Sequence, residues 1–174
     1  MAQGDVERFE SIVLPHLDEA YTLARHLLAN DHDAQDAVQE AVLRALRHFE
    51  TYREGNARAW LLAIVRNCCH TWRRKHRASW TTVEYVDEDH GDALGRFQSP
   101  DATPIAESDR AAIARAVAEL SPEFREVIVL REIQELSYKE IAHIVGVPVG
   151  TIMSRLARAR RRLQHALGVG AREA

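Results

Sequence analysis

The deciding stretch of this chain is LSYKEIAHIVGVPVGTIMSRLARARRRL, residues 136–163, which predicts two short helices joined by a tight turn. Ser137 and Glu140 have the spacing of a capping box, in which the hydroxyl and the carboxylate each accept a backbone N–H at the start of a helix. Gly146 supplies the left-handed residue that ends the first helix, and Pro148 suits the opening of the second. A helix-turn-helix of this shape lays its second helix in the DNA major groove.

The second of these helices is rich in arginine on the side that a DNA groove would meet. An arginine fork reads guanine, and serine or threonine holds phosphate or base edges. The predicted duplex-DNA contacts are Thr151, Met153, Ser154, Arg155, Arg158 and Arg162. Inward packing is predicted for Ile152, Leu156, Ala159 and Leu163. A helix pair that binds protein is the alternative, and the cap, the turn glycine and the clustered arginines together favour DNA.

Composition places the chain among soluble globular proteins. It has 174 residues, of which 46% are hydrophobic and 28% charged. No run approaches the roughly 20 apolar residues that span a bilayer, and the first residues lack the pattern of a signal peptide. We therefore expect a cytoplasmic protein with no membrane insertion. The formal net charge is −3, but the charges of opposite sign lie in different parts of the chain. Acidic residues gather at 84–92, and arginines gather near the C-terminal end of the sequence.

Catalysis and metal binding find little support in the sequence. The only cysteines, Cys68 and Cys69, are adjacent, so they cannot form a structural disulfide framework. A zinc or redox site with His70 is disfavoured, because consecutive helical residues point in different directions. No nucleophile and base pair or phosphate-binding glycine loop is recognisable. We expect no cofactor, no metal and no enzymatic activity.

The first part of the chain has helical periodicity throughout. Helices are predicted over residues 6–28, with an interruption near Pro15, over 34–49 and over 57–76. In the last of these, the core positions are Leu61, Ile64, Val65, Cys68 and Trp72. The other face bears a basic stripe of Arg66, His70, Arg73 and Arg77, extended by Arg74 and Lys75. A solvated helix end, whose cations complement the helix dipole, is the simpler alternative for such a stripe.

The helical spacing of apolar residues is lost between residues 79 and 104. Glycines, prolines and the acidic run in this stretch predict an interdomain linker. Helical spacing resumes with Ile113, Val117 and Leu120, and Ser121-Pro122 opens a further helix. The predicted fold is all-α, with two small helical domains at 1–78 and 105–174, joined by the acidic linker 79–104.

Four stretches in the expected order resemble the extracytoplasmic-function group of bacterial alternative sigma factors, the small kind with regions two and four only. Residues 33–45, DAQDAVQEAVLRA, are similar to the core-polymerase-binding motif, and residues 58–67, RAWLLAIVRN, resemble the promoter-melting helix that follows it. Residues 120–127, LSPEFREV, and the helix-turn-helix resemble region four. Met153 departs from relatives that often have a basic residue there, so the preferred promoter sequence is not predicted.

The resemblance implies a role for each set of residues. The clamp helices of the largest RNA polymerase subunit would be contacted by Asp36, Gln39, Glu40 and Leu43. The melted minus-ten strand would be held in a pocket of Tyr52, Arg53 and Asn56, and along Arg58, Arg66, Asn67, His70, Arg73 and Arg74. The helix-turn-helix would read the minus-thirty-five duplex. Trp60 is interpreted as core rather than as a stacking platform.

The family also implies an anti-sigma factor that covers the exposed binding faces, and the linker would allow a clamped form of the two domains. A sigma-like decoy that binds a regulator instead of DNA is the runner-up, although it would not need the basic stripes. A stand-alone helix-turn-helix repressor would leave the first ninety or so residues unexplained.

Overall fold

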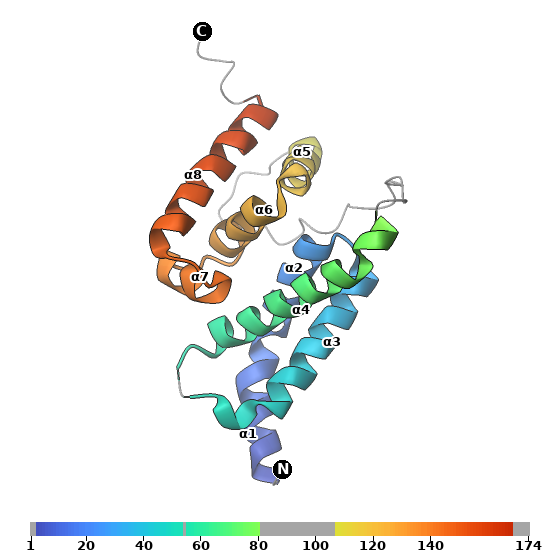
Figure 1. Cartoon of the computed structure of the whole chain (residues 1–174), viewed down its shortest axis with the longest axis vertical. Coiled ribbons are helices and arrows are strands. Elements are labelled where there is room, and N and C mark those ends of the chain that lie inside the picture. Colours follow the sequence, from blue (N-terminus) through green and yellow to red (C-terminus); the bar gives the residue numbers. More distant parts are fainter. Residues whose placement is uncertain (1–2, 54, 81–106, 169–174) are drawn as a thin grey trace.

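The computed structural model describes residues 3–53, 55–80 and 107–168, and every regular element within these ranges is helical. The first helical group contains α1 (Gln3–Val13), α2 (Leu17–Leu28), α3 (Asp31–Arg47) and α4 (Ala57–Trp80), with the short 3₁₀ turns η1 (Leu14–His16) and η2 (Phe49–Thr51). The second helical group contains α5 (Glu107–Glu119), α6 (Pro122–Ile128), the π-helical turn η3 (Val129–Ile133), α7 (Tyr138–Val145) and α8 (Val149–Ala166). Figure 1 shows the first group below the second. The predicted all-α class is confirmed.

The predicted linker at residues 79–104 lies outside the described residues, except for its first two positions, which extend α4 to Trp80. The predicted domain boundaries therefore stay a prediction.

Local signals account for the helix boundaries of the first group. Pro15, which has no backbone N–H, stands in η1 between α1 and α2, as the predicted interruption requires. The side chain of Asn30 accepts the N–H of Asp33 at 3.0 Å and begins α3 three residues before the predicted start. Asn56 accepts the N–H of Ala59 at 2.9 Å and caps α4 in the same way.

Small residues let α3 lie close to its neighbours. Its buried face consists of alanines, namely Ala34, Ala37, Ala41 and Ala45, which α2 and α4 cover. Larger side chains on those two helices fill the centre, among them Leu23, Leu28, Leu61, Leu62 and Val65. At one end, the Phe49 ring lies 5.3 Å edge-on from Phe9 and 5.9 Å in a stack from Tyr52. The rings fix the loop that leads into α4.

In the second group, the predicted helix-turn-helix is confirmed in detail. Ser137 and Glu140 form a complete capping box, and Gly146 ends α7 with φ 76° and ψ 33°. Pro148 precedes the first residue of α8, whose buried side is made of Ile152, Leu156 and Ala159. The chain between α6 and α7 was not predicted in its detail, because it passes through the π-helical turn and then through Glu135 at φ 54°.

Candidate nucleic-acid and partner interfaces

The outward face of α8 presents most of the predicted duplex-DNA contacts to solvent. Met153 is 53% exposed, Ser154 and Arg158 are exposed, and Thr151 and Arg155 are half-buried. The Ser154 hydroxyl donates to the Thr151 carbonyl at 3.0 Å, which holds it against its own helix. Side chains from adjacent turns thus share one surface beyond the turn at Gly146, the arrangement that a groove-reading helix needs.

The last turns of α8 contact other parts of the second helical group. The Arg160 guanidinium lies 2.6 Å from Glu132, and this hydrogen bond raises the pKa of the arginine. The Arg162 guanidinium lies 4.8 Å above the Phe124 ring in a cation–π contact. Arg162 therefore has a packing role in the structure beside its predicted role in DNA binding.

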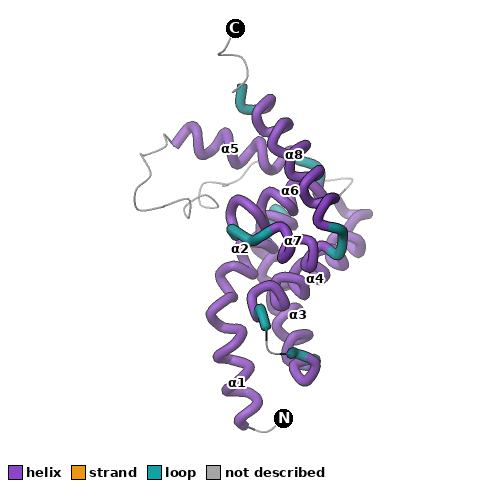
Figure 2. Tube along the Cα trace, turned by 90° about the vertical axis from the view of Figure 1, so that its left-hand side faces the viewer, coloured by secondary structure: helices purple, strands orange, loops and turns teal. Residues whose placement is uncertain are grey.

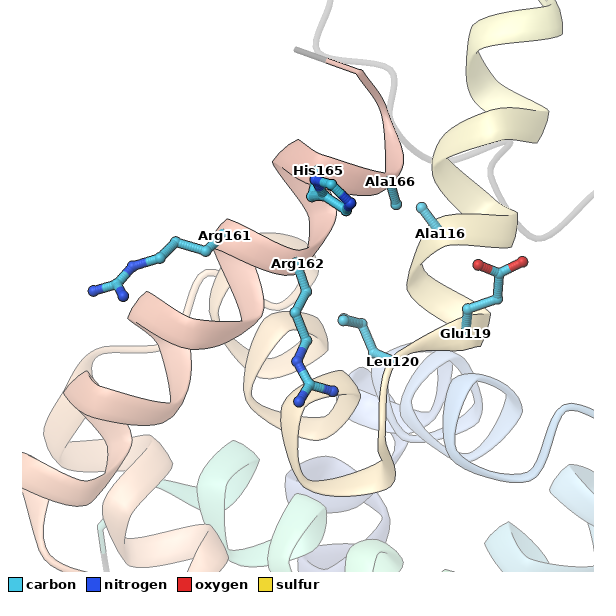
Figure 3. A pocket seen from close by; sticks show the side chains of 7 residues that line it. All are labelled: Ala116, Glu119, Leu120, Arg161, Arg162, His165 and Ala166. Atoms are coloured by element: carbon cyan, nitrogen blue, oxygen red, sulfur yellow. The ribbon is translucent and has the colours of Figure 1, made fainter. Parts of the chain in front are cut away.

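A shallow pocket between α5 and α8 was not predicted from the sequence. Its apolar part is formed by Ala116, Leu120 and Ala166, and its polar rim by Glu119, Arg161, Arg162 and His165. Figure 3 shows Arg162 directed toward Leu120 across the pocket, while Arg161 points away from it. Helical spacing on α8 could have found the cations, but their nearness to α5 depends on the tertiary fold.

A second pocket lies between α3 and α4, where the predicted polymerase contacts gather. Asp36 and Gln39 are exposed, Leu43 is 42% exposed, and the wall from α4 is formed by Cys68, Thr71, Trp72 and Lys75. The structure thus brings the four predicted polymerase contacts into one groove. Glu40 accepts from Arg44 at 2.7 Å, and this hydrogen bond lowers the pKa of the carboxyl. The buried Trp72 Nε1 finds no hydrogen-bond partner in the described part of the chain.

The predicted minus-ten residues fall into two sets. Arg53, Asn67 and Arg74 are exposed, Arg73 is half-buried, and Tyr52 stacks in the aromatic cluster with its hydroxyl donating to the Gly55 carbonyl at 3.1 Å. The other four, Asn56, Arg58, Arg66 and His70, contact the second helical group. We call these four residues the donor face of α4.

Glu126 of α6 is the main partner of the donor face. Its side chain is 2% exposed, and its two oxygens accept from the Arg66 fork at 2.6 and 3.2 Å. The His70 ring lies 3.1 Å from the same carboxylate. Burial alone would raise the pKa of Glu126, but hydrogen bonds from His70 and Arg66, together with their charges, hold it below its ordinary value. The carboxylate is therefore ionised at neutral pH.

Gln134, just after η3, forms a second junction. Arg58 Nη2 donates to the Gln134 backbone carbonyl at 2.5 Å and approaches its side-chain oxygen at 3.2 Å. Arg58 Nε donates to Glu19 at 2.8 Å, while the Gln134 amide donates to the Glu19 carbonyl at 3.0 Å. One arginine thus joins α2, α4 and the second group.

A third contact pairs the starts of two helices. Asn56, which caps α4, donates through Nδ2 to Glu140 at 2.5 Å, and Glu140 belongs to the capping box of α7. In both views α7 lies beside α4 (Figures 1 and 2), and the buried side chains of the two groups form one continuous cluster. Sequence reasoning missed Glu126, Gln134 and Glu140 as partners of α4. The position of Glu126 directly before the apolar run 127–130 was the one available signal of burial.

The cysteines have the properties of packing residues. Cys68 and Cys69 are buried free thiols, and burial raises the pKa of Cys69 to about 12. The described residues hold no cluster of three or more histidine, cysteine or acidic side chains that would suit a metal ion. Within the same ranges, no helix combines the length and the apolar character needed to cross a membrane.

Comparisons with known proteins agree with the arrangement of the elements. Residues 12–79 match the family described as Sigma-70 region 2, and residues 110–163 match the family described as Sigma-70, region 4. Over 94% of its length, the chain is 30% identical to the ECF RNA polymerase sigma-E factor of Escherichia coli K12 and covers 88% of that protein. It is also 33% identical, over 93% of its length, to the ECF RNA polymerase sigma factor SigE of Mycolicibacterium smegmatis, and spans 62% of that longer relative.

A solved structure has a similar fold. The sigma factor RpoE, in complex with the anti-sigma factor NepR from Bartonella quintana, superposes with a TM-score of 0.73 at 28% identity. The match covers 94% of this chain and 98% of the other.

Proposed function

The chain belongs to the extracytoplasmic-function group of RNA polymerase sigma factors, and we propose that it directs core polymerase to promoters by holding a minus-thirty-five duplex on α8 and a melted minus-ten strand on α4. Members of this family are transcription initiation factors and not enzymes. RNA synthesis is therefore the work of the polymerase, and this chain contributes binding and placement.

The outward face of α8 is the observation that carries the duplex contact. Its apolar side is committed to the core, so Arg155, Arg158 and Ser154 are left to face a ligand. Arginine discriminates guanine by about 1–3 kcal/mol, and the hydroxyl suits phosphate. The exposed Met153 adds an apolar group that fits a thymine methyl rather than a phosphate.

We place the polymerase contact in the groove between α3 and α4. Leu43 is an exposed apolar side chain among the carboxylates and amide of Asp36, Gln39 and Glu40. An apolar centre with a charged rim is typical of interfaces that form and dissociate.

Reconstitution tests the whole function. Bacterial core polymerase with this protein should start transcription on genomic DNA of the native host at sites that core alone does not use, as read by sequencing transcript starts. Replacing Arg155 by Ala should weaken binding to a cognate minus-thirty-five duplex by about 1–3 kcal/mol and leave core affinity unchanged. Arg115→Ala, an exposed arginine of α5, is the matched control. Absence of any new transcript start would rule the function out.

The polymerase groove has its own test. Leu43→Asp should reduce core-polymerase affinity at least about tenfold, because it places a charge at the apolar centre of the contact. Leu14 is 55% exposed and lies in η1, away from the groove, so Leu14→Asp controls for adding a charge at an exposed leucine. Equal effects of the two variants in fluorescence-detected core binding would contradict the assignment of the groove.

We further propose an anti-sigma partner. Support comes from RpoE, which has a similar fold and is bound by the anti-sigma factor NepR. Affinity purification of the chain from its native host should recover a second small protein in addition to polymerase subunits. Recovery of polymerase alone, from cells grown without any stress, would contradict this part.

A further inference from the structure

We propose that Val149 and Met153 form an apolar edge on α8 that recognises thymine through its C5 methyl group, so that a thymine at one position of the minus-thirty-five element contributes to the promoter preference of this chain. The inference deepens the proposed function and rests on it in one respect, which is that α8 enters the major groove of the duplex. It names a base that the helix prefers and the residue that selects this base.

The apolar edge stands out among the exposed side chains of the protein. Five large apolar side chains are exposed within the described ranges, and two of them, Val149 and Met153, lie on α8 with exposed fractions of 36% and 53%. Their spacing of four residues places them on adjacent turns of one side of the helix. Ala157, one turn further along, is also exposed. Exposed apolar side chains normally occur singly, so a row of them on successive turns points to a contact surface.

The apolar edge and the groove-reading arginines lie on opposite flanks of α8. Arg155 follows Met153 by two residues, which places it about 200° around the helix axis. Ser154 lies between them, about 100° from each, and is exposed. Ile152 and Leu156 hold the remaining side of the helix in the core. A helix inserted in the major groove would therefore present apolar side chains to one wall of the groove and cations to the other.

Thymine is the base whose chemistry fits the apolar edge. In the major groove the base pairs present hydrogen-bond donors and acceptors, and thymine adds an apolar group, its C5 methyl. A phosphate or a polar base edge would lose water against Met153 without gaining a hydrogen bond in return. The side chain of Met153 is long, unbranched and flexible, so it can adjust its end to the position of a methyl group. The apolar edge should therefore favour a thymine–adenine pair.

A protein partner is the other class of ligand that exposed apolar side chains could meet. Stable protein interfaces bury about 800 Å² on each partner, far more than one methionine and one half-covered valine can offer. The apolar edge also continues into the exposed Ser154 and Arg158, whose side chains suit base edges and phosphates. These neighbours favour DNA as the ligand, and a protein contact becomes one of the outcomes that the experiment can detect.

The test uses the full chain assembled with core polymerase. This holoenzyme selects duplexes from a library in which an upstream segment of about one helical turn, roughly ten base pairs, is randomised. Sequencing of the selected duplexes should show one position at which thymine is preferred. Deoxyuridine at that position removes the methyl group and keeps the base pairing. Burial of one methyl group corresponds to about a fourfold change in affinity, so holoenzyme binding, measured by fluorescence anisotropy, should weaken by about that factor.

Variants of Met153 show whether the apolar edge makes the methyl contact. Met153→Gln keeps the length of the side chain but ends it in an amide, so this variant should bind the thymine and deoxyuridine duplexes equally. Met153→Leu keeps an apolar side chain and should retain most of the fourfold difference. Leu14 is 55% exposed in η1, so Leu14→Gln is the matched control and should leave the difference unchanged. Deoxyuridine at any other thymine of the duplex controls for the modified base itself.

Failure of this inference can be told apart from failure of the proposed function. If the wild-type holoenzyme binds both duplexes equally while Arg155→Ala still weakens binding to the selected element, α8 reads DNA without the apolar edge, and only the inference is overturned. A difference that survives Met153→Gln overturns it too, because another residue then meets the methyl group. Weaker binding of Met153→Gln to core polymerase would assign the apolar edge to a protein contact instead. Selection of no upstream element would contradict the proposed duplex contact, and the inference with it.

Discussion

Replacing Gly146 by alanine should destabilise the helix-turn-helix through the backbone alone. Gly146 ends α7 at φ 76°, and its N–H donates to the Ala142 carbonyl at 2.9 Å. A Cβ built there meets no atom within 4 Å, so steric overlap with neighbours adds nothing to the cost. The expected loss is the penalty of holding an alanine in the left-handed region, about 1–2 kcal/mol.

Gly150 provides a matched control with the opposite expected sign. It lies in the first turn of α8, its φ is not in the left-handed region, and a Cβ there also meets nothing within 4 Å. Alanine at this position should therefore stabilise the protein, by up to about 1 kcal/mol, because it restricts the unfolded chain and favours the helix. Identical chemical changes four residues apart thus have opposite consequences.

Thermal and urea unfolding, followed by far-ultraviolet circular dichroism, measure both variants. For a chain of this length, 1 kcal/mol corresponds to a change in melting temperature of about 2–4 °C. Gly146→Ala should lower the melting temperature, and Gly150→Ala should raise it or leave it unchanged. If Gly146→Ala proved as stable as the wild type, the left-handed glycine would not be needed and the account of this turn would be wrong.

Three other predictions concern side chains. Burial, together with the charges of Arg25 and Arg125, lowers the pKa of His26 in the folded protein to about 4. Between about pH 6.5 and pH 4, the unfolded chain therefore binds one more proton than the folded protein. The free energy of unfolding then decreases as the pH falls through this range. Urea unfolding at pH 7 and pH 4.5 measures this decrease, and His26→Gln should make it smaller by up to about 3 kcal/mol. If the variant and the wild type lost the same stability between the two pH values, His26 would not be the cause. Cys69, whose pKa burial raises to about 12, should react with a thiol reagent at pH 8 only after denaturation, so rapid labelling of the native protein would contradict its burial. Ser137→Ala removes a cap and should cost about 1 kcal/mol in thermal unfolding, whereas no change would show that the capping box is dispensable.

Features that depend on neighbours in sequence were predictable. Asn30, Ser137 and Gly146 each act within four residues, through caps and backbone conformation, so the boundaries of α3 and α7 follow from local chemistry. The inward face of α8 could also be predicted from the sequence, because helical periodicity specifies which positions share a side of the helix. The π-helical turn and the left-handed conformation of Glu135 could not be predicted from the sequence, because no glycine or proline marks that stretch.

The partners of α4 could not be predicted for a different reason. A stripe of arginine and histidine donors is equally satisfied by a carboxylate, a phosphate or water, so its sequence does not reveal which acceptor it meets. Arg66 finds Glu126 sixty residues away, and that pairing depends on how two complete helical groups pack. The basic stripe and the buried glutamate become interpretable only together.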